Sequence, residues 1–467
     1  MSALTTTGPA ADRQVAARRA VEALRSGVPS RAAVAALGAA QTDIEDRFAA
    51  LLGQVRDGPI GAPRPGGLLV GGGFGAGKSH LLEHLMHLAL QANFVVSRVV
   101  VSKETPLHDP VKVFRAAAES ASLPDSYEQG SLAEAAAALD ADSGAWVELS
   151  RWVNSPHSEL SERFAATLLL FGRFGASDGE LAEAIIRFWS GDPIRVADLR
   201  RRLREAGEAR FALSAVPARE LARQRLRFAA RLFTAAGYAG WVVLFDEVEL
   251  IGRYSVLQRG RSYAELARWV RRDETDPGVP LVAVLAMTDD FEAAVVSGKN
   301  DRTVVPAKLR ARQTHESDEI AARAEVGMQI IDREMLLLAP PDAGELDRAY
   351  SRLKELHSEA FGWDPPEVAG LERLAATRMR QYVRAWINEW NLVRLDPAPG
   401  LRGPGAAGRS GGLQGQQGTR VTALGVPQPV TGSQPRVASK PVMPSMELSP
   451  VVTSWKVAAY RGLLAMS

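Results

Sequence analysis

Apolar residues gather in five short, nearly continuous runs along the chain, and longer segments with a different spacing separate them. The runs fall within residues 68–70, 94–103, 241–250, 279–290 and 334–339. Runs of this length are typical of strands that are buried on both faces of a parallel sheet. Between them, apolar residues recur every three or four positions, as they do along one face of a helix. The pattern predicts an α/β fold in which helices cover both faces of a parallel sheet.

The same patterning divides the chain into six segments. One Ala-, Leu- and Arg-rich stretch lacks strand patterning and predicts a helical insertion. The C-terminal stretch is rich in Gly, Pro, Gln and Ser, a composition that cannot bury a core and predicts disorder. The predicted bounds are 1–58 for an N-terminal helical segment, 59–122 for the first half of a core, 123–216 for the insertion, 217–339 for the second half of the core, 340–396 for a helical lid and 397–467 for a disordered tail.

Composition and charge mainly exclude certain kinds of site and of localisation. The 467 residues carry a formal net charge of +2 and include no cysteine. Disulfides, thiolate metal sites and cysteine nucleophiles are therefore excluded. The near-neutral charge gives no overall attraction to nucleic acid, although it leaves room for a local basic surface. We see no signal peptide and no window near the roughly 18 consecutive apolar residues of a membrane span, so we expect a cytoplasmic protein without membrane contact.

The first apolar run leads into a glycine-rich loop that suits a phosphate group. Within GGGFGAGKSH, the spacing from Gly72 to Ser79 fits the pattern G-x-x-x-x-G-K-[ST]. Glycines let backbone N–H groups wrap the α- and β-phosphates of a nucleotide, and the following helix directs its N-terminal N–H groups at the same anion. Lys78 is expected between the β- and γ-phosphates, with the Ser79 hydroxyl on Mg²⁺. The residues predicted to bind ATP are Gly72, Gly73, Phe74, Gly75, Ala76, Gly77, Lys78, Ser79 and His80.

Two carboxylates end the third apolar run. Asp246 and Glu247 directly follow the apolar residues VVLF, and the carboxyl end of a parallel strand is where an open α/β sheet binds ligands. We expect Asp246 to hold Mg²⁺ through water and Glu247 to polarise the attacking water. A module that only binds nucleotide needs the first carboxylate but not the second, so the pair favours hydrolysis. The simpler alternative is a solvated acidic turn.

Polar and basic residues farther along the chain complete the set of candidate site residues. Thr288 ends the fourth apolar run and is predicted to help position water near the γ-phosphate, unless it only caps a turn. Arg380, near the start of an amphipathic helix, could contact the γ-phosphate, in competition with Arg378 and Arg384. The alternative is a solvated arginine beside an aromatic core stripe. An arginine supplied to the active site of a neighbouring subunit could be Arg302, Arg310 or Arg312. The simpler interpretation of these three residues is a charged surface.

The order of these features resembles that of AAA+ ATPases, and the helical preface and lid resemble their origin-recognition/Cdc6 and STAND branch. Longer phrases, among them NFVVSRVVVSKETPLHDPVKVFRAA, LFDEVELIGRYSVLQRGRSYAELARWV and RQYVRAWINEWNLVRLDP, resemble the BrxD family of bacteriophage-exclusion (BREX) systems. The resemblance covers residues 21–397. It implies a P-loop NTPase of AAA+ type with a helical insertion and a C-terminal helical lid. It also implies ATP and Mg²⁺ as cofactors and other phage-defence proteins as partners, including a DNA methyltransferase and a phosphatase-like protein.

Three functions are compatible with this sequence. The leading hypothesis is an ATP hydrolase, with slow or partner-dependent turnover, that couples ATP to assembly or remodelling of a phage-defence complex on double-stranded DNA. The second is a switch or scaffold with little turnover, for which the helical preface and insertion provide partner surfaces. The third is a DNA-binding module tuned by ATP, against which the net charge argues; a metabolite kinase fits the acidic pair less well. The basic residues of 252–266 could face DNA or a partner, although a solvated surface is the simpler interpretation, and a homo-oligomer is a further candidate.

Overall fold

The computed structural model of the chain describes residues 9–27, 31–58, 66–124, 132–271, 279–368 and 379–396. All of them belong to one compact unit that spans Met1–Arg402. The tail predicted at 397–467 lies outside the described residues. Among the helices that are described, none is long and apolar enough to cross a membrane.

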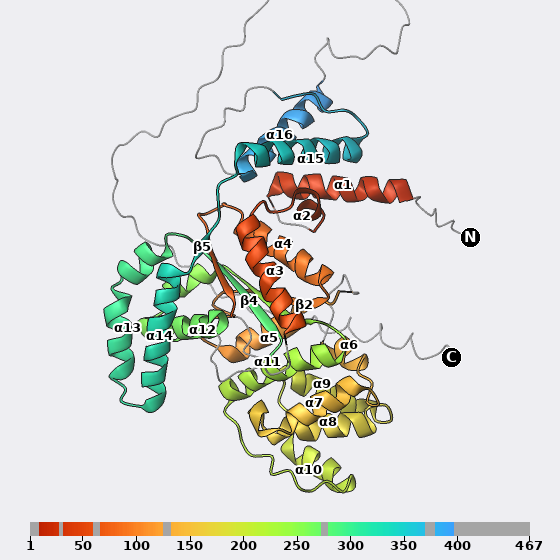
Figure 1. The fold of residues 1–467 in the computed structure, drawn as a ribbon, viewed down its shortest axis with the longest axis vertical. Helices are drawn as coiled ribbons and strands as arrows, with labels where there is room; N and C mark the ends of the chain where they lie inside the picture. The colour runs from red at the N-terminus through yellow and green to blue at the C-terminus, as the bar shows by residue number, and fades with distance from the viewer. Residues whose placement is uncertain are drawn as a thin grey trace, which may run out of the picture. The chain divides into compact units, whose positions relative to one another are not determined.

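A five-stranded parallel sheet organises this unit (Figure 1), and its strand order is β2-β3-β4-β1-β5. Its strands are β1 (Leu68–Gly71), β2 (Phe94–Val100), β3 (Gly240–Asp246), β4 (Leu281–Met287) and β5 (Leu336–Leu337). Each predicted apolar run overlaps one of these strands. Both β3 and β4 are buried along their whole length, as continuous apolar runs require. The predicted α/β parallel sheet is confirmed.

Each face of the sheet is covered by its own apolar core. Side chains alternate along a strand, so Val96 of β2 points to one face and Val95 to the other. The first face packs against α3 (Thr42–Asp57) and α4 (Lys78–Gln91). The other face packs against helices that include α5 (Pro110–Glu119), α11 (Ala218–Ala235), α12 (Val256–Val270) and α14 (His315–Arg333). The layered arrangement fixes α4, the helix that follows the glycine loop, directly over the sheet.

The segment between α5 and α11 is helical, as its patterning predicts. It contains α6 (Leu132–Ala137), α7 (Gly144–Val153), a 3-10 turn η1 (Pro156–Ser158), α8 (Glu162–Phe174), α9 (Gly179–Ser190) and α10 (Val196–Glu205). Its interior is aromatic: the ring of Phe164 lies 5.4 Å from that of Phe188, and the ring of Trp189 lies 5.1 Å from that of Phe228 on α11. The insertion therefore shares the core of one sheet face instead of forming an independent unit.

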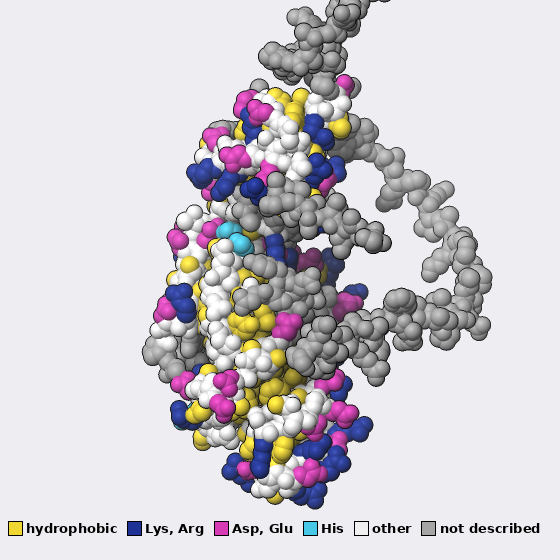
Figure 2. Space-filling model, turned by 90° about the vertical axis from the view of Figure 1, so that its right-hand side faces the viewer, with side chains coloured by type: hydrophobic (Ala, Val, Ile, Leu, Met, Phe, Trp, Pro, Cys, Tyr) yellow, Lys and Arg dark blue, Asp and Glu magenta, His cyan; other side chains and the backbone are white. Residues whose placement is uncertain are grey.

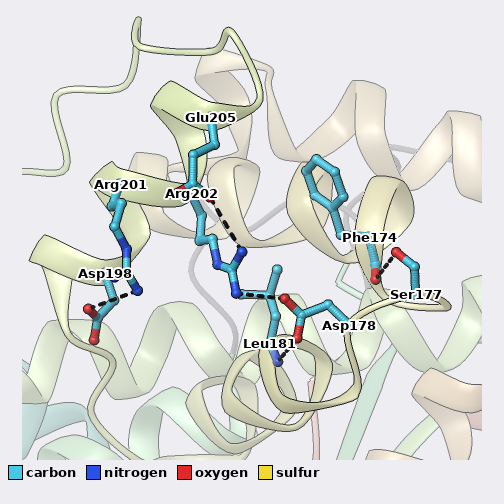
Figure 3. A network of polar contacts seen from close by, with 8 residues as sticks. All are labelled: Phe174, Ser177, Asp178, Leu181, Asp198, Arg201, Arg202 and Glu205. Atoms are coloured by element: carbon cyan, nitrogen blue, oxygen red, sulfur yellow. Dashed lines mark hydrogen bonds and ion pairs between the residues drawn. The ribbon is translucent and has the colours of Figure 1, made fainter.

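The outer side of the insertion is held by ion pairs between basic and acidic residues. Arg202 of α10 contacts Asp178 at 2.7 Å and Glu205 at 3.3 Å, while Asp178 also accepts a hydrogen bond from the first turn of α9 (Figure 3). Figure 2 shows basic and acidic side chains interspersed over the lower part of the described residues. Arg201 and Arg202 of α10 thus have carboxylate partners, whereas Arg200 and Arg204 donate to backbone carbonyls.

Helices from both ends of the chain form a third core. In Figure 1, α1 (Pro9–Ser26) and α2 (Arg31–Leu37) lie together with α15 (Ala343–Phe361) and α16 (Met379–Leu395). Their shared interior includes Val21 of α1, Leu353 of α15 and Trp390 of α16, each fully buried. We call this group the four-helix unit. The predicted bounds 1–58 and 340–396 stay predictions, but the packing joins α1 and α2 to the lid helices and assigns α3 to the sheet.

Two linkers connect the four-helix unit to the sheet, and they are bonded to each other. Gln41 lies before α3, and Ala339 lies between β5 and α15. The Gln41 side-chain amide donates to the Ala339 carbonyl at 3.1 Å, and its oxygen accepts from the Ala339 N–H at 2.9 Å. The reciprocal pair satisfies the exposed backbone groups of Ala339 and keeps the two linkers side by side.

We expect Trp390→Ala to destabilise the four-helix unit by about 3–5 kcal/mol, because a fully buried indole would be replaced by a cavity. Urea unfolding followed by far-ultraviolet circular dichroism would measure the loss. Leu392→Ala on the same helix is the control, since that side chain is 65% exposed and its removal should change stability by no more than about 0.5 kcal/mol. Equal losses in the two variants would contradict the third core.

Candidate active site

Parallel pairing brings the predicted site segments to one edge of the sheet. Gly71 ends β1 directly opposite Met287, which ends β4. The register of β3 on β4 pairs Phe245 with Leu285, so Asp246 ends β3 close to the residue that ends β4. Because β4 lies between β1 and β3, Thr288 follows at a position between the glycine loop and the acidic pair. A phosphate held by the loop and a metal held by Asp246 would therefore meet at this edge.

The glycine loop has the backbone conformation that its composition predicts. Gly75 and Gly77 have φ angles of +76° and +110°, in the left-handed region that glycine adopts without strain. Gly77 is the N-cap of α4 and contributes no side-chain acceptor, so the first N–H groups of α4 stay directed at the loop. Lys78 is 9% exposed, and its ammonium donates to the carbonyls of Gly72 at 2.8 Å and Gly73 at 3.4 Å. The lysine charge thus lies over the cradle where phosphates are expected.

His80 and Phe74, two further residues predicted to bind ATP, lie in different environments. The His80 ring Nε2 donates to the Gly38 carbonyl at 2.7 Å, so its side chain faces the linker before α3. Burial lowers the pKa of His80 below its ordinary value, which favours the neutral imidazole. Phe74 at the tip of the loop is 84% exposed. Their predicted contacts with ATP stay predictions.

The acidic pair has two carboxylates in different environments. Asp246 is 5% exposed, and its Oδ2 accepts a hydrogen bond from Arg98 at 2.7 Å. Glu247 is exposed and has φ 57° and ψ 33°, a left-handed conformation that is unfavourable for a residue with a side chain. Such strain persists only where surrounding structure enforces it, and it is concentrated at functional sites. The turn holds one carboxylate inside the site and turns the next one toward solvent.

Arg98 is a site residue that the sequence reasoning missed. It lies on the same face of β2 as Phe94 and Val96, which are buried against α3 and α4. Its guanidinium bridges Asp246 of β3 and Glu83 of α4, with Nη1 3.4 Å from the Glu83 carboxylate. A cation inside a buried strand needs a carboxylate partner. The sequence signal for this position is the single arginine within the apolar run FVVSRVVV.

Glu249 is a second site residue that the sequence reasoning missed. It lies in the 3-10 turn η2 (Val248–Arg253) that follows the acidic pair. Burial raises its pKa, the charge of Lys78 lowers it, and the charge of Asp246 raises it further. Its Oε2 is buried and has no hydrogen-bond partner among the described residues. An unpartnered buried carboxylate oxygen beside other acids fits a site that takes a cation or ordered water.

The donor set at this edge fits a magnesium ion shared with a nucleotide. Oxygen ligands are available from the Ser79 hydroxyl and the Asp246 carboxylate, which are the kind that Mg²⁺ prefers. Within the described ranges, no group of three or more His, Cys, Asp or Glu side chains could hold a metal ion alone. Mg²⁺ usually keeps water and phosphate oxygens in addition to one or two carboxylates, so phosphates would complete the set.

Three of the predicted arginines have partners within the chain. Arg380 donates to the Ser26 carbonyl at 3.4 Å, which places it against the C-terminal end of α1 inside the four-helix unit. Arg302 contacts Glu292 at 2.9 Å, and Arg310 contacts Glu325 at 3.0 Å. Arg384 is exposed on α16, Arg312 is exposed after α13 (Asp301–Arg310), and Arg378 lies outside the described residues. The roles proposed for them at a γ-phosphate stay predictions.

The basic segment 252–266 is mostly the start of α12, and its arginines differ in exposure. Arg259 is 6% exposed and bonds to Asp301 through Nε at 2.7 Å. Tyr263 donates to the same carboxylate at 2.7 Å. Arg259 therefore ties α12 to α13 and cannot face DNA, whereas Arg253 is exposed. The DNA role considered for this segment is wrong for Arg259 and stays a prediction for the rest.

Comparison with known families gives one match. The family model described as "BREX system ATP-binding protein BrxC/D" matches residues 13–136 and 158–386, most of the chain. The match confirms the resemblance and does not separate BrxC from BrxD. No curated protein and no solved structure matches the chain.

We expect the chain to lose stability as pH falls below about 6.5, the ordinary histidine value. Burial lowers the pKa of His80, so the unfolded chain takes up the proton first and unfolding becomes easier in that range. Burial lowers the pKa values of His108 and His357 in the same direction. His80→Gln keeps a donor for Gly38 but does not titrate, so its melting temperature should fall less between pH 7.5 and pH 5.5. An unchanged pH dependence in His80→Gln, with exposed His315→Gln as control, would contradict this assignment.

Proposed function

We propose that this chain, which belongs to the BREX system ATP-binding protein BrxC/D family, is an AAA+-type ATP hydrolase. In this proposal it uses ATP binding and hydrolysis to assemble or remodel a multi-protein phage-defence complex on double-stranded DNA in the cytoplasm. The observation that supports hydrolysis is the strained turn after β3, which exposes Glu247 beside the buried Asp246 at the edge of the glycine loop. A site built for binding alone would not need that second carboxylate.

Each residue of the proposed site has a distinct task. Backbone N–H groups of the glycine loop and of the first turn of α4 bind the phosphates, and Lys78 neutralises charge between the β- and γ-phosphates. Ser79 and Asp246 would hold Mg²⁺, which offsets the charge that develops on the phosphate oxygens. Glu247 accepts a hydrogen bond from the attacking water, and Thr288 fixes the position of that water from the neighbouring strand.

The contacts of the arginines also support a second candidate, a nucleotide-dependent switch with little turnover. Arg302, Arg310 and Arg380 all have partners within the chain. An arginine at the γ-phosphate contributes greatly to turnover in related chemistry. Slow hydrolysis by the isolated chain would then rise only when another copy, another BREX protein or DNA changes these contacts.

The direct test is to measure ATP binding and steady-state hydrolysis for wild type, Lys78→Ala and Glu247→Gln, with and without duplex DNA. Lys78→Ala should weaken ATP binding about 10- to 100-fold, because a charged group at the phosphates is lost. Glu247→Gln should bind ATP normally and hydrolyse it about 10²- to 10⁴-fold more slowly. Exposed Lys112→Ala and Glu119→Gln, both on α5, are the matched controls.

One result would separate the two candidates, and two others would test the roles of Glu247 and of DNA. Wild type that binds ATP but does not hydrolyse it in any mixture would replace the hydrolase with the switch. Hydrolysis that is equal in wild type and Glu247→Gln would show that Glu247 does not orient the water. Stimulation of turnover by duplex DNA would support action on DNA.

A further inference from the structure

The Arg98 guanidinium is shared between two carboxylates that belong to different layers of the fold. Asp246 Oδ2 lies 2.7 Å from Nη2, and Glu83 Oε2 lies 3.4 Å from Nη1. One positive charge therefore serves two negative ones, and the cluster has an excess of negative charge. The exposed fractions of the side chains are 7% for Asp246, 12% for Glu83 and 29% for Arg98. At such burial, charges interact more strongly than they would at the surface.

Glu83 is placed so that it connects this cluster to the phosphate end of α4. It follows Ser79 by four residues in α4 (Lys78–Gln91), so the two side chains share one face of the helix. Arg98 reaches Asp246 from that same side of the sheet. The arginine thus lies between the predicted metal ligand and a carboxylate one helical turn below the other predicted ligand.

A metal ion at Asp246 and a guanidinium on the same carboxylate repel each other. Two like charges about 4 Å apart are strongly destabilising in a partly buried site. Arg98 can move to relieve this repulsion, because β2 is the outermost strand of the sheet and the Arg98 side chain is 29% exposed. A long, flexible arginine side chain can move to Glu83 without a change in the backbone.

We propose that Arg98 is a positioning residue that competes with Mg²⁺ for Asp246, and that Glu83 takes up the guanidinium when the metal binds. The proposal rests on the proposed function, in which Asp246 belongs to the magnesium site. It gives Arg98 a regulatory effect, because the strength of its contact with Asp246 sets the Mg²⁺ concentration at which nucleotide is retained. Glu83 has the opposite effect, because it stabilises the displaced arginine.

The test is the Mg²⁺ concentration that gives half-maximal binding of radiolabelled ATP, measured by equilibrium dialysis on the full chain. Arg98→Gln removes the competitor and should lower that concentration by about tenfold, the effect of one charged hydrogen bond. Glu83→Gln removes the alternative partner and should raise it. A merely structural ion pair would reduce stability in both variants and would not move the Mg²⁺ requirement in opposite directions.

The control is Arg115→Gln, which removes an exposed ion pair with Asp192 at 3.0 Å and should leave the Mg²⁺ requirement unchanged. Thermal denaturation checks that each variant folds, and Glu83→Gln tests the proposal even if Arg98→Gln does not fold. Shifts in the same direction, no shift, or a higher requirement in Arg98→Gln would overturn the proposal. Failure of wild type to bind ATP at any Mg²⁺ concentration would instead overturn the proposed function, and this inference with it.

Discussion

Parallel pairing of β1, β4 and β3 in one register is the constraint on which the site depends. Strands that run in the same direction end at the same edge, so the loop after β1, the threonine after β4 and the acids after β3 converge although the sequence separates them. The helices then have to cross back over the faces of the sheet, which explains the two cores that enclose it. The insertion and the four-helix unit are additions to this arrangement.

At that edge, buried charge is distributed among few groups. Asp246 and Glu249 are drawn into the protein, Glu247 is turned out, and Lys78 and Arg98 are the nearby cations. Each buried carboxylate raises the free energy of the folded chain unless a cation neutralises it. In the proposed function, a divalent metal and a polyphosphate would complete each other, since either one alone would leave uncompensated charge.

Much of this could be predicted from local sequence patterns, and the rest could not. The apolar runs, the glycine loop and the acidic strand end are local signals, so the sheet is confirmed, and the structure places Gly72, Lys78, Asp246 and Glu247 at one edge. The pairing of Arg98 with Asp246 joins residues far apart in the sequence, as does the packing of α1 on α15. The environment of Arg259 likewise could not be predicted from local sequence. Its sequence context indicated a surface residue, whereas an ion pair with Asp301 holds it in the interior.

The paired linkers at Gln41 and Ala339 also determine how the four-helix unit can move. A unit attached through one linker can rotate about any axis. Two linkers bonded side by side restrict rotation mainly to bending across the pair. Leu338 donates to the Gly71 carbonyl at 2.8 Å, and Gly38 accepts from His80, so the pivot adjoins both ends of the glycine loop. With its 18 residues, α1 is about 27 Å long, at 1.5 Å per residue. A rotation at these linkers would therefore move the far end of α1 farther than the residues beside the glycine loop.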